Sequence, residues 1–206
     1  LEKLVIPEGI EHISFDVFKG AKIKELVLPS TLKTACPAFH NAVIEKLVVP
    51  EGAQLEELLG VHKNNTGQIT EIVLPQTCVL KSNNSLYTSI PIKKVVLKEG
   101  SHFVFDEFLK YNADVEEVVL PEGIVQIGKE AFRSCKNLKK INIPKSVTLI
   151  SSEAFSFTAI ESIEIPENLK GINNHVFYHC SNLRNIVLPD TIQWVGESAF
   201  RGCKQL

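Results

Sequence analysis

The sequence lacks the features of a membrane-spanning, nucleic-acid-binding or disulfide-rich chain. No apolar run approaches the ~20 residues that a transmembrane helix needs. The 206 residues carry a formal net charge of -2, so no basic field attracts nucleic acid or an anionic membrane. The five cysteines are odd in number and widely spaced, unlike a disulfide framework. We therefore expect no membrane insertion within this segment and no nucleic-acid partner.

Signatures of catalysis are also missing. The sequence contains no G-x-S-x-G, G-x-x-x-x-G-K-[ST], G-x-G-x-x-G or C-x-x-C motif. The nearest approach to a metal-ligand cluster is His175, His179 and Cys180, which has no acidic partner in its segment. We interpret these histidines as surface or half-buried side chains. The prediction is a chain that is not an enzyme, with no catalytic residue, metal or cofactor.

What the sequence does contain is a repeat that ends in proline. Each copy runs large apolar, two polar, large apolar, any residue, large apolar, Pro. The prolines are Pro7, Pro29, Pro50, Pro75, Pro121, Pro144, Pro166 and Pro189, with Lys98 in the one place where proline is missing. Successive copies are 21 to 25 residues apart. A period of this length predicts a solenoid, because one unit cannot bury its apolar face without its neighbours.

Equivalent positions of successive repeats, here called stations, predict the core from the residues that follow each proline. In the unit from Leu138 to Ser156, an apolar pair follows the proline and an Ala-Phe pair closes the turn. The recurring phenylalanine should form a stacked column along the solenoid, with members at Phe132, Phe155, Phe177 and Phe200. Cysteine recurs three residues after it, at Cys135, Cys180 and Cys203. We interpret these as free, packed thiols, because neighbouring rungs hold their Cβ vectors parallel.

The unit L-x-x-I-x-I-P-x-x-V-x-x-I-x-x-x-A-F-x-x-C resembles the BspA-type leucine-rich repeat over essentially the whole chain. The resemblance implies a repeat solenoid: a curved right-handed β-rich leucine-rich repeat with a parallel sheet on the concave face. We expect residues 1–206 to be a single domain of about nine repeats of 21–25 residues. Leu1 and Leu206 fall inside the pattern, so we expect a fragment of a longer array, uncapped at both ends.

Charged side chains alternate in sign at two outward stations of the first strand. Four residues before the proline stand Lys3, Glu25, Lys46, Glu71, Lys94, Glu117 and Lys140. Five residues before it stand Glu2, Lys24, Glu45, Thr70, Lys93, Glu116, Lys139, Glu161 and Arg184. Strands about 4.8 Å apart would pair these charges. We favour a role in register and solubility over a charged binding surface, since a binding patch usually carries one sign.

A third outward station, two residues before the proline, holds mostly valine. Its members are Val5, Val27, Val48, Val73, Val96, Val119, Asn142, Glu164 and Val187. Strand propensity explains part of this column, and a stripe that contacts a ligand is the alternative. The candidate binding residues on this face are Val73, Val96, Val119, Lys94, Glu117, Lys140 and Asn142.

The pattern weakens in the central units, where polar runs at 63–68 and 81–85 replace the Ala-Phe turn. Repeat decay with a surface loop is one explanation, and a binding loop is the other. Proteins with this repeat are surface proteins of bacteria and of some protozoan parasites. The resemblance implies a non-enzymatic module of a cell-surface or secreted protein that binds or adheres to a host or extracellular matrix protein. A structural spacer that presents a neighbouring domain is the alternative.

Overall fold

The computed structural model describes residues 1–35, 38–52, 67–75 and 90–206. They divide into two compact units, Leu1–Lys98 (unit 1) and Glu99–Leu206 (unit 2). Short β-strands joined by turns make up both units, and the described residues contain no helix, so none of them forms a helical membrane span. Cys36, Cys78 and most of the two central polar runs lie outside the described residues.

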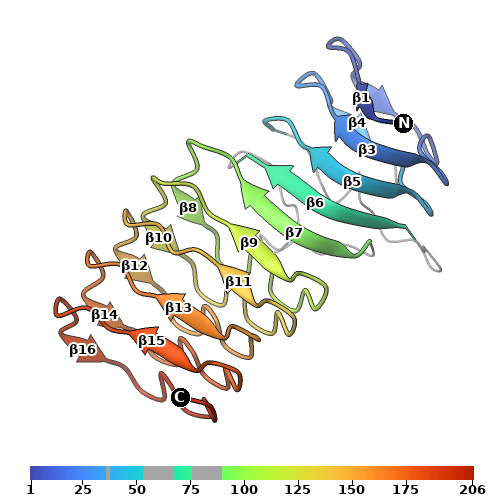
Figure 1. Cartoon of the computed structure of the whole chain (residues 1–206). Coiled ribbons are helices and arrows are strands. Elements are labelled where there is room, and N and C mark those ends of the chain that lie inside the picture. Colours follow the sequence, from blue (N-terminus) through green and yellow to red (C-terminus); the bar gives the residue numbers. More distant parts are fainter. Residues whose placement is uncertain (36–37, 53–66, 76–89) are drawn as a thin grey trace. The chain divides into compact units, whose positions relative to one another are not determined.

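Unit 1 is built on a parallel sheet in the order β1-β3-β5-β6-β7 (Figure 1). Its strands are β1 (Lys3–Val5), β3 (Lys22–Val27), β5 (Val43–Val48), β6 (Gln68–Leu74) and β7 (Ile92–Leu97). A second parallel pair joins β2 (His12–Ile13) to β4 (Thr34–Ala35). Corresponding repeat stations pair across the sheet, as Leu4 does with Leu26 and Leu26 with Leu47. The expected solenoid register is thereby confirmed.

Unit 2 repeats this plan with shorter strands (Figure 1). The strands that precede the prolines, here called main strands, are β9 (Glu117–Val119), β11 (Lys140–Ile141), β13 (Ser162–Glu164) and β15 (Asn185–Val187). The second strand of each repeat comes after the proline position, which Lys98 holds in the case of β8. These strands are β8 (Phe103–Val104), β10 (Gln126–Ile127), β12 (Leu149–Ile150), β14 (Gly171–Ile172) and β16 (Trp194–Val195). Among the main strands of this unit, β9 pairs with β11 and β13 pairs with β15, but no ladder joins β11 to β13.

The phenylalanine column forms as the sequence predicts. In unit 2, Phe132, Phe155 and Phe177 have no exposed surface. The ring centroids of Phe132 and Phe155 lie 5.4 Å apart, those of Phe155 and Phe177 5.5 Å, and those of Phe177 and Phe200 5.6 Å, all within 9° of parallel. Phe18 and Phe39 stack in the same way in unit 1. Buried rings at this spacing provide stacking contact between neighbouring rungs.

The fifth repeat keeps this geometry although its sequence departs from the pattern. The amide of Leu109 donates to the carbonyl of Ala131, just as the amide of Phe132 donates to that of Ala154. Leu109 therefore takes the phenylalanine station, and Phe108 fills the alanine station before it. Both side chains are buried.

The turns that hold the phenylalanines form a hydrogen-bond ladder of their own. Alternate amides, such as those of Glu130, Phe132 and Ser134, donate to carbonyls of the next rung, and the amides between them close local turns. The first and last of these three donors have positive φ angles, 55° and 61°. Such angles are uncommon outside glycine and cost free energy. The ladder offsets that cost, since it satisfies backbone groups that face the next rung.

The cysteines of the repeat form hydrogen bonds in addition to packing in the core. Cys135, Cys180 and Cys203 are all free, and the first two are buried. Their thiols donate to the carbonyls of Leu109, Phe155 and Phe177 at 3.0, 3.0 and 3.1 Å. Burial raises the pKa of Cys135 to about 12 and that of Cys180 to about 11. Each thiol is therefore a neutral donor that satisfies a carbonyl of an earlier rung.

Candidate functional site

The face of the main strands that points away from the core, here called the outer face, carries the predicted ion-pair ladder in unit 1. Strand register places Lys3, Glu25, Lys46, Glu71 and Lys94 on successive rungs. The Lys3 ammonium lies 2.8 Å from the Glu25 carboxylate, and that of Lys94 lies 3.3 Å from the Glu71 carboxylate. The hydrogen bond from Lys3 lowers the pKa of Glu25 below its ordinary value. Alternating sign therefore pairs charges along this face.

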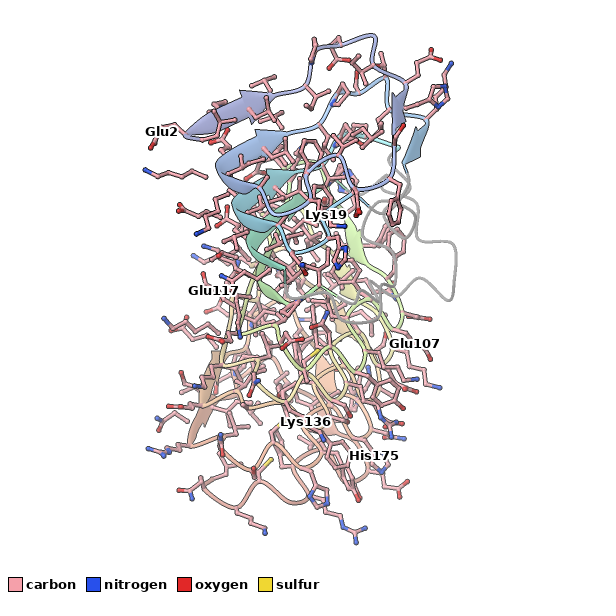
Figure 2. The ribbon with its side chains drawn as sticks, turned by 90° about the vertical axis from the view of Figure 1, so that its right-hand side faces the viewer. Glu2, Lys19, Glu107, Glu117, Lys136 and His175 are labelled. Atoms are coloured by element: carbon pink, nitrogen blue, oxygen red, sulfur yellow. The ribbon has the colours of Figure 1, made fainter. Side chains whose placement is uncertain are left out.

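The same chemistry recurs at its margins. In the neighbouring row, the Lys24 ammonium lies 2.8 Å from the Glu2 carboxylate. Figure 2 shows Glu2 projecting from the first rung. Lys33 lies 2.7 Å from Glu11, beside the β2–β4 pair. These side chains are 45 to 84% exposed, so each pair adds little to stability. Their main effect is to leave the face nearly neutral.

The valine stripe of unit 1 lies beside the ion-pair ladder, two residues further along each strand. The main-strand register places Val5, Val27, Val48, Val73 and Val96 in one line. Val5 is 53% exposed, and the other four are half-buried. Because the core side of the same strands is filled by fully buried leucine and isoleucine, the valines do not serve the core. They form a continuous apolar strip that faces solvent.

The predicted binding residues fall in both units. Val73, Val96 and Lys94 belong to β6 and β7 of unit 1. In unit 2, Glu117 pairs in register with Lys140, and Val119 and Asn142 hold the third outward station. The Asn142 amide accepts a 2.8 Å hydrogen bond from the Leu120 amide and donates one of 2.6 Å to the Leu120 carbonyl. Its side chain therefore fastens two rungs together.

Beyond Asn142 the outer face of unit 2 changes character, which sequence analysis missed. The ladder station next to Lys140 holds Ser162 and then Asn185, and both are exposed. Over these short side chains lies an open hollow of about 470 Å³. Glu164 stands in the valine column and lines it. The signal was present in the sequence: two short polar residues interrupt a column of lysine and glutamate.

A second charge network lies on the opposite side of unit 2, in the turns. Figure 2 shows Glu107 and His175 on the side away from Glu117. Lys110 lies 2.7 Å from Glu107 and 2.5 Å from Glu130, and Arg133 pairs with Glu130 and Glu153. Burial disfavours the charge of Lys110, but the hydrogen bonds that its ammonium donates to the two carboxylates outweigh it and raise the pKa. These glutamates hold positive-φ turn positions, so the network anchors strained turns to one another.

The histidines near the C-terminal turns are part of an aromatic cluster. The His179 ring stacks on Phe157 with centroids 5.2 Å apart, and His175 packs edge-on against Tyr178 at 5.2 Å. The Cys180 thiol points instead to the Phe155 carbonyl. Within the described residues, no three His, Cys, Asp or Glu side chains are grouped so as to bind a metal ion.

Comparison with known proteins agrees with this geometry. The family model described as BspA type leucine rich repeat region (6 copies) matches residues 1–110 and 104–206. No curated protein matches the sequence. A solved structure of a leucine-rich repeat protein from T. pallidum (TpLRR) is 25% identical, with a TM-score of 0.54. The alignment covers 71% of this chain and 64% of that protein, so this chain spans less than two thirds of its relative.

Two further solved structures are similar at lower scores. A leucine-rich repeat protein from Bacteroides ovatus is 19% identical, with a TM-score of 0.48 over 100% of this chain and 77% of its own. The pneumococcal vaccine antigen PcpA is 16% identical, with a TM-score of 0.41 over 98% of this chain and 66% of its own.

Proposed function

Because the chain belongs to the BspA-type leucine-rich repeat family, we propose that it is a non-enzymatic protein-binding module of a cell-surface or secreted protein. Its partner is a host or extracellular matrix protein, and its role is adhesion. The family supports the extracellular location. The observation that carries the proposal is the valine stripe of unit 1, an apolar strip that no core packing requires.

The size and surroundings of the stripe fit the centre of an interface. Five valines in line present roughly 200–300 Å² of apolar surface, within what a folded protein tolerates in solution. A stable interface buries about 800 Å² on each partner. The paired lysines and glutamates that lie along one side of the stripe supply polar residues for the rim of such an interface. Because these charges cancel, we expect affinity to depend only weakly on salt.

A binding screen tests the proposal. The 206-residue chain would be presented to a panel of matrix and plasma proteins, together with a variant that combines Val73→Lys and Val96→Lys. Val17→Lys is the matched control, since Val17 is 55% exposed but lies in a turn beside the phenylalanine column. Circular dichroism would verify that all three proteins are folded.

We expect a partner that binds the unmodified chain and the Val17→Lys control but loses affinity for the double variant. Equal binding by the double variant would remove the site from this face. If the unmodified chain captured no protein of the panel, that result would favour the spacer. That alternative rests on the ring stacks and hydrogen-bond ladders within each unit, and it predicts sensitivity to length rather than to surface charge.

A further inference from the structure

The outer face of unit 2 is hollowed along β11, β13 and β15. Two open hollows of about 470 and 460 Å³ share Asn142 and Glu164, and a third of about 770 Å³ continues past Glu164 and Val187. We call this continuous depression the unit 2 groove. Ser162 and Asn185 line the hollow of about 470 Å³.

The groove carries an excess of negative charge. Four carboxylates line it, those of Glu122, Glu164, Glu167 and Asp190, with Lys145 as the single cation of the lining. All five side chains are exposed. None of the four carboxylates forms an ion pair with any residue that the structure describes, unlike Glu25 and Glu71 of the ladder. The groove therefore has charge that nothing within the described chain neutralises.

Part of its lining is apolar. Ile143, Ile165, Pro166 and Pro189 contribute to the lining, and Val187 and Leu188 are 77% and 36% exposed beside the carboxylates. A fitting ligand must cover this surface and also bring positive charge. Nucleic acid is disfavoured, because its phosphates would face the carboxylates. A lysine or arginine side chain satisfies both demands, since its apolar stem lies along the wall while its head reaches the carboxylates.

We propose that the unit 2 groove binds a segment of a partner protein in which lysine or arginine residues stand next to apolar ones. This inference rests on the proposed function and names the chemistry of one partner segment. Unpaired, exposed carboxylates steer a cationic segment toward the groove, and apolar contact with Val187 and Leu188 retains it. Association should therefore weaken as salt rises, in contrast to binding at the neutral stripe of unit 1.

The test measures fluorescence anisotropy of a labelled short peptide that alternates lysine with leucine, at low and at high salt. The variant combines Glu164→Gln with Glu167→Gln, which keeps shape and removes two charges. Its matched control combines Asp114→Asn with Glu197→Gln, two exposed acidic residues of unit 2 outside the groove. A peptide with glutamine in place of lysine tests the need for positive charge, and Val187→Ser tests the apolar wall.

We expect the lysine peptide to bind the unmodified chain and the control alike, and to bind the groove variant about three- to tenfold more weakly. Val187→Ser should also weaken binding. Equal affinity of the groove variant and its control would overturn the proposal, as would equal binding of the glutamine peptide.

The outcome separates this inference from the proposed function. The variant with Val73→Lys and Val96→Lys changes unit 1 alone, so it should bind the lysine peptide no more weakly than the unmodified chain. Suppose that a matrix protein binds the variant with Val73→Lys and Val96→Lys more weakly, while the lysine peptide binds equally well with and without Glu164→Gln and Glu167→Gln. That result would support the protein-binding module and refute the groove. Peptide binding that needs both glutamates, with no partner protein found in the screen, would support the groove alone.

Discussion

Replacing Phe155 by alanine is the most direct challenge to the core described above. Its ring has no exposed surface and lies between Phe132 and Phe177 at 5.4 and 5.5 Å. Removing a buried phenylalanine costs about 3–5 kcal/mol. The loss of two stacked neighbours places this case near the upper end, at about 4–5 kcal/mol. Since domains are stable by about 5–15 kcal/mol, this loss is a large fraction of the total.

Two comparison variants make the measurement specific. Phe155→Leu should cost only about 1–2 kcal/mol, because a leucine fills much of the cavity, as Leu109 does naturally in the fifth repeat. Phe157→Ala changes a ring two residues away that is 36% exposed, and it should cost less than about 1 kcal/mol. Equilibrium unfolding in urea gives all three values. If Phe155→Ala were no more destabilising than Phe157→Ala, the stacked column would not hold the rungs together.

Three other perturbations address the ladders, the thiols and the close approaches. Glu25→Lys should lower the urea midpoint at low salt by placing three lysines on successive rungs, and the deficit should shrink near 1 M salt; a deficit independent of salt would contradict the ladder. The Cys135 thiol has its pKa raised from 9.0 to about 12, so the stability due to its neutral form is complete below pH 9 and is lost as the pH rises toward 12. The free energy of unfolding, measured between pH 8 and 11, should therefore fall more steeply with pH for the unmodified chain than for Cys135→Ala. Parallel curves would refute burial of the thiol. Gly128→Ala should cost about 1–3 kcal/mol, because the new Cβ would lie 2.5 Å from backbone atoms of the preceding rung. Gly171→Ala should cost less, since it meets the movable indole of the single tryptophan, and should shift that indole's fluorescence; equal costs would argue against this difference in contacts.

Spacing alone predicted the parts of the fold that repeat. The phenylalanine column, the strand register and the alternation of Lys3 and Glu25 follow from one period, because a solenoid places equal stations side by side. The role of Leu109 was hidden, since hydrophobic substitution keeps the packing while it erases the motif. The positive-φ glutamates were hidden for a different reason, because they depend on backbone bonds to the next rung and not on residue type.

The candidate site was predicted in part. The valine stripe was visible as a column, but nothing in the pattern identifies a partner. The unit 2 groove lies where the pattern changes, at Ser162, Asn185 and Glu164, and a repeat period carries no information about the residues that depart from it. The clamp that Asn142 forms on Leu120 could not be foreseen, because it depends on the distance between two particular rungs.

The turn ladder has an electrical consequence. In unit 2 the amides of Phe132, Phe155 and Phe177 each donate to a carbonyl about 22 residues further along the chain, and all these bonds point the same way. Peptide dipoles aligned in this manner add, as they do along an α-helix. The row of turns is therefore polarised lengthwise, with partial positive charge toward its C-terminal rungs and partial negative charge toward its N-terminal rungs. Each added repeat lengthens that dipole, so the number of repeats sets an electrostatic property as well as a length.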